Sequence, residues 1–257
     1  MSIVAEISQR ILEAYETGKP IAPVRDRLSG VADAYAVQRA SVDVWLARGR
    51  TVAGHKIGLT SKAVQAQLGV DEPDFGILLA DMILDDGADV VPGRVLQPRI
   101  EGELAFVLKA DLRGERLSAA DVIKATDYVC PAIEICGSRI AGWDIRIADT
   151  ISDNASAGLV VLGKTRMKPV LDEMARVPMS LNHNGALAAE GRGEACLGNP
   201  ALAVAWLGEM LTRLGGGLRA GDVVMSGALA KMVAAEPGSR FVADFGDLGT
   251  VCVQFKR

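Results

Sequence analysis

Glu101 and Glu103 are separated by a single residue, and their spacing could place two carboxylates together at a reactive site. Residues 100–108 alternate like a strand, which points both carboxylates to one face with Cα atoms roughly 6.5–7 Å apart. The opposite face carries Leu104 and Phe106 and is expected to face the core. On a buried face a divalent cation would relieve the repulsion between the carboxylates, and on an edge strand water would solvate both. These residues alone leave both interpretations open.

A third carboxylate, Glu134, interrupts the apolar residues 131–136. An unpaired charge is costly in a buried strand, so Glu134 either lies in water at an edge or has a partner. As a third oxygen ligand beside Glu101 and Glu103, it would leave about three positions of an octahedral cation for water or substrate. The sequence has only two histidines, and its four cysteines form no C-x-x-C pair. A hard cation such as Mg²⁺ or Mn²⁺ is therefore expected rather than zinc or copper.

Lys56 lies in the strand-like segment 54–58, where flanking glycines let backbone or ligand come close. A partly buried lysine can transfer protons or hold an anionic substrate, whereas the usual lysine lies on the surface. Residues 71–76 look like a solvated acidic loop on spacing alone, and caps and turns explain the small polar residues 149–156. Residues 226–229 follow a strand and either present backbone amides to an anion or form a plain turn.

The elements that would position these residues follow from periodicity and from cap and turn signals. Helices are predicted at residues 3–17, 31–48 and 61–68, from the capping box of Ser118 and Asp121 to about Tyr128, and from Asn199 and Pro200 to Leu214. Strands are predicted at 51–57, 100–108, 129–136, 158–162, 222–225, 240–243 and 250–255, with a hairpin at Asn184 and Gly185. This order indicates an α+β chain with a helical N-terminal region at 1–50 and a second domain at 51–257.

Charge and composition argue against several classes of function. The 257 residues include 28 basic and 32 acidic side chains, so 28 − 32 gives −4, and no basic run offers a nucleic-acid surface. The apolar runs are far shorter than the roughly 18 residues that a membrane span needs. Glu6 and Arg10 interrupt the apolar start, so a signal peptide is not expected. We therefore expect a soluble, cytoplasmic protein without nucleic-acid or membrane partners.

Five segments carry a family pattern when they are taken in order. They are residues 54–61 (GHKIGLTS), 72–76 (EPDFG), 98–103 (PRIEGE), 131–134 (PAIE) and 153–156 (DNAS). Together they resemble the 2-keto-4-pentenoate hydratases, which belong with the 4-oxalocrotonate decarboxylases in the fumarylacetoacetate hydrolase-like superfamily. The resemblance implies a small helical N-terminal region followed by a mixed β-roll of the fumarylacetoacetate hydrolase C-terminal type, commonly assembled into homo-oligomers.

The resemblance also implies a site. Mg²⁺ or Mn²⁺ would be held by three glutamates, Glu101, Glu103 and Glu134. The active-site lysine and aspartate of the family match Lys56 and Asp74. Substrate binding would involve Ser156, Gly227, Ala228 and Leu229.

The implied reaction is the addition of water to 2-hydroxypenta-2,4-dienoate to give 4-hydroxy-2-oxopentanoate. It is a hydro-lyase step in the meta-cleavage degradation of aromatic compounds. Alternatives stay open: decarboxylation of 4-oxalocrotonate, hydration of 2-oxohept-3-ene-1,7-dioate, hydrolysis of an acylpyruvate, or noncatalytic binding of a 2-oxo acid. Besides the 2-hydroxydienoate or 2-oxo acid substrate, further copies of the chain and a neighbouring pathway enzyme are the expected partners.

Overall fold

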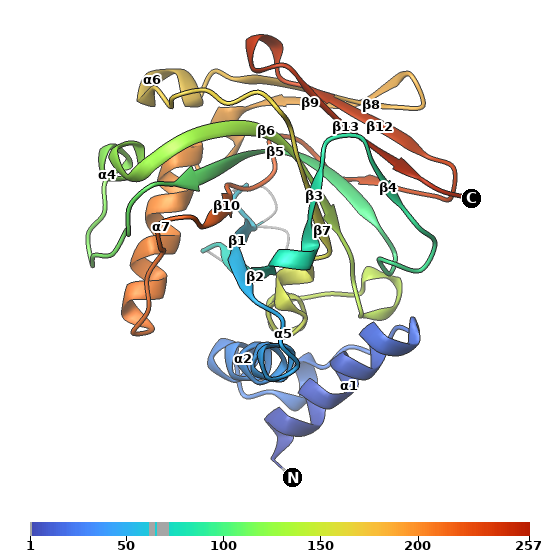
Figure 1. Ribbon diagram of the computed structural model, residues 1–257. Coiled ribbons are helices and arrows are strands. Elements are labelled where there is room, and N and C mark those ends of the chain that lie inside the picture. Colours follow the sequence, from blue (N-terminus) through green and yellow to red (C-terminus); the bar gives the residue numbers. More distant parts are fainter. Residues whose placement is uncertain (1, 62–64, 66–71) are drawn as a thin grey trace.

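The computed structural model describes residues 2–61, 65 and 72–257. Two helices come first, α1 (Ile3–Thr17) and α2 (Val31–Ala47), and pack against each other below the curled sheets (Figure 1). The Ser2 side chain caps α1 by accepting a hydrogen bond from the Ala5 amide, and Gly18 ends it with a left-handed φ of 69°. Both helices lie where the apolar spacing predicts them. The predicted helix at 61–68 lies outside the described residues.

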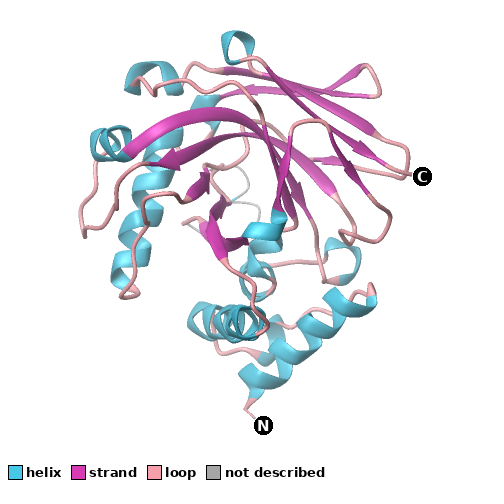
Figure 2. Ribbon diagram, in the orientation of Figure 1, coloured by secondary structure: helices cyan, strands magenta, loops and turns pink. Residues whose placement is uncertain are grey.

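The remaining elements are mostly strands, as Figure 2 shows. In chain order they are β1 (Val52–Gly58), β2 (Asp74–Leu79), β3 (Ile83–Asp85), β4 (Ala88–Val90), β5 (Arg99–Leu108), α4 (Ala119–Ala125), β6 (Thr126–Cys136), α5 (Ile147–Ser152), β7 (Leu159–Leu162), α6 (Leu171–Met174), β8 (Pro178–His183), β9 (Ala186–Arg192), α7 (Pro200–Arg213), β10 (Val223–Met225), β11 (Val233–Ala234), β12 (Arg240–Asp244) and β13 (Thr250–Phe255). Helices first and strands afterwards is the predicted α+β order.

Two sheets form the β-roll. An eight-stranded mixed sheet runs β2-β1-β10-β5-β6-β7-β3, with β11 added to β5, and a five-stranded sheet runs β4-β13-β12-β8-β9. The second sheet lies across the long curved strands β5 and β6 (Figure 1). β5 and β6 are central in the first sheet, and most of their side chains are buried on both faces. This is the mixed β-roll that the resemblance implies.

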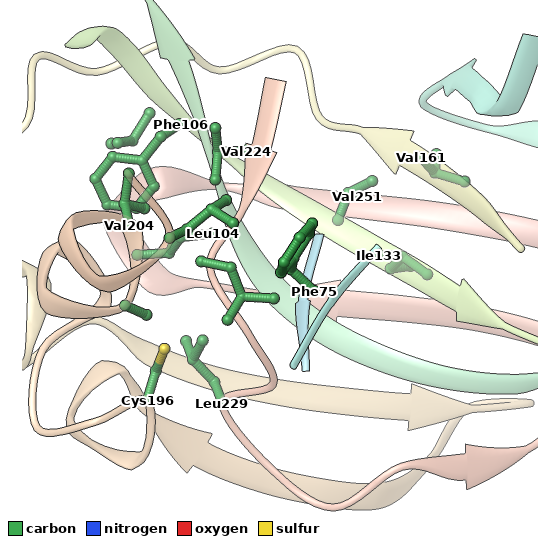
Figure 3. Packing of buried hydrophobic residues seen from close by; sticks show 14 of the residues in the cluster. Phe75, Leu104, Phe106, Ile133, Val161, Cys196, Val204, Val224, Leu229 and Val251 are labelled. Atoms are coloured by element: carbon green, nitrogen blue, oxygen red, sulfur yellow. The ribbon is translucent and has the colours of Figure 1, made fainter. Parts of the chain in front are cut away.

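The core side of β5 carries Leu104 and Phe106, both fully buried. Figure 3 shows them beside Val224 of β10 and Val204 of α7, so this helix covers one face of the sheet. Burial of each such side chain contributes roughly 1.5–3 kcal/mol. The packing holds β5 firmly and so fixes the residues on its other face.

Local signals in the sequence set most of the boundaries. The predicted hairpin joins β8 to β9 through Asn184 and Gly185, with φ of 52° and 86°. The capping box of Ser118 opens α4 as predicted. The predicted end of this helix near Tyr128 is wrong, because α4 stops at Ala125 and the chain continues as β6. The Thr126 hydroxyl donates to the carbonyl of Val122 and ends the helix in extended backbone.

The N-terminal helices rest on the loop and helix that precede β7. Ile7, Val37 and Ile140 share one apolar cluster, and the buried Asp149 accepts hydrogen bonds from the Val24 and Arg25 amides. The predicted boundary at residue 50 follows the end of α2, and we keep it as a proposal. Each helix in the described part of the chain is too short or too polar to cross a membrane.

Candidate active site

Three glutamates meet on the inner face of β5 and β6. The antiparallel register places Glu101 opposite Glu134 and Glu103 opposite Ala132. Glu103 and Glu134 are 0% exposed, and Glu101 is half-buried. The edge-strand interpretation is therefore wrong for both segments. Directly opposed like charges destabilise a sheet unless something neutralises them.

Several carboxylate oxygens in this group make no hydrogen bond. Both oxygens of Glu134 and Oε1 of Glu103 are buried without a hydrogen-bond partner. The Sγ of Cys136 lies 3.4 Å from Oε2 of Glu101, and one ligand atom from each of Glu101, Glu134 and Cys136 lies within 4.8 Å of the others. A buried charge without partners is expensive, and an oxygen-binding cation would satisfy these atoms. The donor set therefore fits a divalent metal ion.

The third predicted ligand, Glu103, lies beside this compact group. Its Oε2 accepts a hydrogen bond of 2.8 Å from the Gly227 amide, which leaves Oε1 to face a cation. Cys136 is the group member that residue spacing did not predict. Burial and then the Glu101 charge raise the pKa of its thiol well above the ordinary value. A neutral thiol is a poor ligand for a hard cation, so Cys136 serves Glu101 as a hydrogen-bond donor.

Electrostatics confirm that the three carboxylates repel one another. Burial, followed by the charge of Glu134, raises the pKa of Glu101 to about 7. Burial and the charges of the other two glutamates raise the pKa of Glu103 well above its ordinary value. Without a cation, the cluster keeps protons that free carboxylates lose at neutral pH.

Lys56 reaches the same cluster from β1. Its side chain is buried, with Nζ 3.4 Å from Oε1 of Glu134 and 2.9 Å from the Ala155 carbonyl, to which it donates a hydrogen bond. The surface-lysine interpretation is therefore wrong. Burial lowers the pKa of Lys56, but the charges of Glu134 and its neighbours outweigh that effect and leave the pKa raised. The ammonium stays protonated beside the carboxylates.

Asp74 is the first residue of β2 and lies opposite Gly58 of β1. It is buried, so the solvated-loop interpretation is wrong for this residue. Its Oδ2 accepts a hydrogen bond of 3.3 Å from the Thr150 hydroxyl, which is also 3.3 Å from the Ser156 hydroxyl. Its Oδ1 has no hydrogen-bond partner. Burial is the main cause of its raised pKa.

Gly58 keeps the approach to Asp74 and Lys56 open. A Cβ atom at this position would lie 2.2 Å from Oδ1 of Asp74 and 3.2 Å from Nζ of Lys56. Gly58 also lines a cavity of about 620 Å³ whose wall includes Glu101 and Ala228. The missing side chain therefore leaves space between the cavity and the two candidate proton-transfer groups.

The segment that supplies Ala155 and Ser156 has unusual backbone. Asn154, Ala155 and Ser156 all have left-handed φ angles, of 53°, 50° and 55°. Such conformations cost energy for residues other than glycine and persist where surrounding contacts enforce them. Asn154 provides one contact, because its side chain accepts from the Ile77 amide and donates to the Ile77 carbonyl. Caps and turns are present at 149–156, since Asp149 accepts from the Arg146 amide at the start of α5 and a 3-10 turn covers Asn154–Ser156, but the stretch is also buried.

Of the three substrate-binding residues predicted in the turn after β10, two lie at the site. Gly227 has a φ of 109° and its amide donates a hydrogen bond to Glu103, and Ala228 lines the cavity. The Leu229 amide donates to the Gly102 carbonyl, and its side chain packs in the core beside Cys196 (Figure 3). Gly227 and Ala228 therefore lie at the site, whereas Leu229 anchors the turn. Ser156 lies at the site through Thr150.

Residue spacing gave no signal for Thr150 or for the Ala155 carbonyl. The Thr150 hydroxyl is placed by α5, and the carbonyl by the left-handed turn that follows this helix. Both positions depend on contacts with β1 and β2, which are remote in the sequence.

The fold agrees with sequence comparison. Residues 45–256 match the family described as fumarylacetoacetate (FAA) hydrolase C-terminal, and the chain belongs to this family.

Two relatives are similar to this chain over more than nine-tenths of their own length. The 2-keto-4-pentenoate hydratase 2 of Dechloromonas aromatica (strain RCB) is 48% identical over 241 residues, covering 93% of this chain and 92% of that protein. The 2-keto-4-pentenoate hydratase of Paraburkholderia xenovorans (strain LB400) is 47% identical over 254 residues, covering 98% and 94%.

Solved structures show the same fold. The 4-oxalocrotonate decarboxylase from Pseudomonas putida G7, complexed with magnesium and adipate, superposes with a TM-score of 0.94 at 32% identity, covering 98% of this chain and 97% of that one. The fumarylpyruvate hydrolase from Pseudomonas aeruginosa, in complex with Mn²⁺ and pyruvate, gives a TM-score of 0.63 at 16% identity, covering 80% and 89%. At this identity, the second likeness concerns the fold alone.

Proposed function

We propose that this protein is a divalent-metal-dependent hydratase that converts 2-hydroxypenta-2,4-dienoate to 4-hydroxy-2-oxopentanoate in the degradation of aromatic compounds. The observation that carries the proposal is the buried cluster of three glutamates with unpartnered oxygens beside Lys56 and Asp74. The sequence identity of 47–48% to proteins named 2-keto-4-pentenoate hydratase supports this choice of reaction.

Glu101, Glu103 and Glu134 would hold Mg²⁺ or Mn²⁺, because their carboxylates fit a hard cation. When bound, such an ion binds the carboxylate and 2-oxygen of the substrate and polarises the dienol as a Lewis acid. The three glutamates neutralise the charge of the ion. The burial of Glu103 and Glu134 excludes competing water from their ligand atoms.

The hydration needs two proton movements. The dienol loses its hydroxyl proton and gains one at C5, which gives the 2-oxo-3-enoate, and water then adds oxygen at C4 and a proton at C3. Asp74 is the candidate for proton transfer, because its Oδ1 has no partner and faces the space beside Gly58. Lys56 remains charged between Glu134 and the Ala155 carbonyl, and favours negative charge on the reacting carbons. A proton-transfer group must lie within hydrogen-bond distance of the proton that it moves.

Substrate contacts are proposed for Ser156, Gly227 and Ala228, with Leu229 fixing the turn that carries two of them. The Thr150 hydroxyl joins Ser156 to Asp74. We also propose that the chain forms homo-oligomers, associates with a neighbouring pathway enzyme and works in the cytoplasm.

Replacement of two metal ligands tests the function. We expect the double variant Glu101→Gln with Glu134→Gln to lose at least about 10³-fold in magnesium-dependent hydration, since the Lewis acid supplies several kcal/mol. Product analysis uses the five-carbon dienoate, the seven-carbon dicarboxylate and 4-oxalocrotonate, with and without magnesium. Intact metal-dependent turnover in the double variant would show that the site assignment is wrong.

A second candidate is decarboxylation of 4-oxalocrotonate at the same site. The TM-score of 0.94 to the decarboxylase from Pseudomonas putida G7 favours it, but the identity of 32% is lower than that to the hydratases. Release of carbon dioxide from 4-oxalocrotonate, without hydration of the five-carbon dienoate, would establish this alternative.

A further inference from the structure

Side chains, rather than another strand, cover the outer edge of β2. This strand is at the end of the eight-stranded sheet, so alternate carbonyl and amide groups of its backbone point away from β1. The Asn154 side chain binds both backbone groups of Ile77 at this edge. The Phe75 carbonyl accepts a hydrogen bond of 2.8 Å from Nε2 of Gln38 in α2. A helix of the N-terminal region therefore binds the strand one residue after Asp74.

The same amide nitrogen also binds α5, against which α2 packs (Figure 1). Nε2 of Gln38 donates a hydrogen bond of 3.3 Å to the Ile151 carbonyl. The last carbonyl groups of a helix need partners from outside it, and α5 ends at Ser152. Ile151 follows Thr150, whose hydroxyl donates to Oδ2 of Asp74. Gln38 therefore joins the two backbone segments that carry Asp74 and its hydroxyl partner.

The face of α2 around Gln38 is packed closely against β2. The Gln38 side chain is buried. Tyr35 lies three residues earlier and shares this face, and its ring stacks on Phe75 with centroids 4.9 Å apart and an angle of 22° between the planes. Burial and then the charge of Asp74 raise the pKa of Tyr35, so a neutral phenol lies near that carboxylate. The contact between α2 and the start of β2 is therefore made by two side chains.

The Asp74 carboxylate has few contacts of its own to hold it. Its Oδ1 has no hydrogen-bond partner, and the bond of Oδ2 to Thr150 is 3.3 Å long. Hydrogen bonds between two oxygens are usually about 2.5–3.0 Å long, so this one is weak. The backbone beneath the two residues therefore decides how the carboxylate lies. A misplacement of about 1 Å in a reacting group can reduce a rate by about 100-fold.

We propose that Gln38 is a positioning residue for the proton transfer assigned to Asp74. By binding the Phe75 and Ile151 carbonyls together, it fixes the Asp74 carboxylate relative to Thr150 and to the substrate. This role rests on the proposed function, in which Asp74 moves the proton and the metal ion binds the carboxylate and 2-oxygen of the substrate. Gln38 should therefore govern turnover rather than substrate binding. It also lies outside residues 45–256, which match the family, so the N-terminal region contributes to the active site.

Kinetics of Gln38→Met with the five-carbon dienoate and magnesium test the proposal. Methionine has a similar length but cannot donate to either carbonyl. We expect kcat to fall by about 10- to 100-fold while KM changes by less than about threefold, since the carboxylate is displaced and the metal ion still holds the substrate. A raised KM with an unchanged kcat would overturn the proposal.

Gln254→Met is the matched control. The Gln254 amide also donates to backbone carbonyls, those of Gly238, Ser239 and Phe255, in and beside the second sheet. Because these contacts do not involve β1, β2 or α5, kcat and KM of this variant should match those of the unaltered protein. A kcat loss equal to that of Gln38→Met would show that the effect is not specific to the site, and would overturn the proposal.

A second background separates positioning from a loss of folded protein. In the Asp74→Asn protein there is no carboxylate to position, so Gln38→Met should lower the residual kcat by less than about twofold. A purely structural role would remove active protein and lower kcat by the same factor in both backgrounds, which would overturn the proposal. If Gln38→Met does not fold, Gln38→Asn replaces it, because the shorter amide cannot reach both carbonyls, and the same loss of kcat is expected.

Deuterium exchange at C3 of 2-oxopentanoate, in D₂O with magnesium, separates this role from the proposed function. A C3–H bond breaks, a C3–D bond forms with deuterium from the solvent, and no water adds to the carbon chain. If the dienoate is not hydrated but exchange is about tenfold slower or more in Gln38→Met, the positioning role holds and the proposed reaction fails. Unaltered exchange and hydration in Gln38→Met overturn the positioning role. Absence of both reactions in the unaltered protein overturns both proposals.

Discussion

Two buried carboxylates of this molecule, Asp153 and Glu134, have opposite surroundings. Asp153 accepts hydrogen bonds from the amide and Nε of Arg139, and its own carbonyl accepts from Nη2. The third guanidinium nitrogen donates to the Ala157 carbonyl, and the guanidinium lies 4.1 Å from the ring centroid of Tyr15. Glu134, equally buried, has neither oxygen in a hydrogen bond. A buried charge with its hydrogen bonds made is satisfied within the fold, and one without them indicates a ligand site.

Removing the charge of Asp153 tests whether its pairing with Arg139 is structural, and it has the largest expected effect. Asp153→Asn should lower the free energy of unfolding by about 3–5 kcal/mol, because Arg139 keeps a buried charge without a counter-ion. Denaturant unfolding measures it. Asp127→Asn, which breaks the exposed pair with Lys168, should cost at most about 1 kcal/mol. Equal losses in the two variants would contradict the distinction.

The matching change on the ligand side is Glu103→Gln. Here the metal-free protein should lose little stability, because the amide oxygen still accepts from Gly227 and the raised pKa of Glu103 leaves its carboxyl group protonated and uncharged without a cation. Addition of magnesium at about 100 times the dissociation constant should stabilise the unaltered protein by about 2.7 kcal/mol and the variant by less. Thermal unfolding with and without magnesium measures both quantities. A large loss of stability in the metal-free variant would show that Glu103 has a structural role, like Asp153.

A methyl group added at Gly58 should block the space beside Asp74 and Lys56. Gly58→Ala should reduce turnover by about tenfold or more, since its Cβ would displace the Asp74 carboxylate, and overpacking costs about 1–3 kcal/mol. The control is Gly216→Ala, whose added Cβ meets its nearest atom at an ordinary 3.5 Å. Steady-state assays of both variants decide the matter, and full activity in Gly58→Ala would show that the approach lies elsewhere.

The smallest expected effect is a pH dependence. Glu101, with its pKa raised from 4.5 to about 7, keeps a proton in the folded metal-free protein that the unfolded chain releases. Stability without metal should therefore fall as pH rises from about 4.5 through about 7. A cation competes with that proton, so apparent metal affinity should rise with pH, and displacement of the Glu101 proton contributes at most about tenfold per unit below pH 7. Metal titrations at several pH values check this, with Glu101→Gln expected to give a flatter profile.

Much of the fold could be predicted because its signals are local. Apolar spacing and caps placed α1, α2 and α7, and the pair of Asn184 and Gly185 placed the hairpin. The end of α4 was mispredicted because Thr126 leaves the helix to pair with Leu108 of β5, a contact between segments that are separated in the sequence. Strand order and the pairing of the two sheets could not be predicted, since they depend on contacts between remote segments.

The site shows the same division. Its carboxylates and Lys56 could be singled out from residue type, but spacing alone left each of them open to a surface interpretation. Family resemblance, rather than spacing, pointed to Asp74. Spacing gave no indication of Thr150 or of the strained turn at residues 154–156, because their roles arise from contacts with β1 and β2.

The sequence by itself determined the chemistry available to this protein: few histidines, an E-x-E strand, a lone glutamate in an apolar run and a glycine-bracketed lysine. Only the tertiary structure decided that these groups are buried together, with Glu101 opposite Glu134 and the Lys56 ammonium beside them. The physical reason is that the energy of a charge depends on what surrounds it. Solvation, repulsion and the absence of hydrogen-bond partners are properties of the assembled sheets, and no short stretch of sequence contains them.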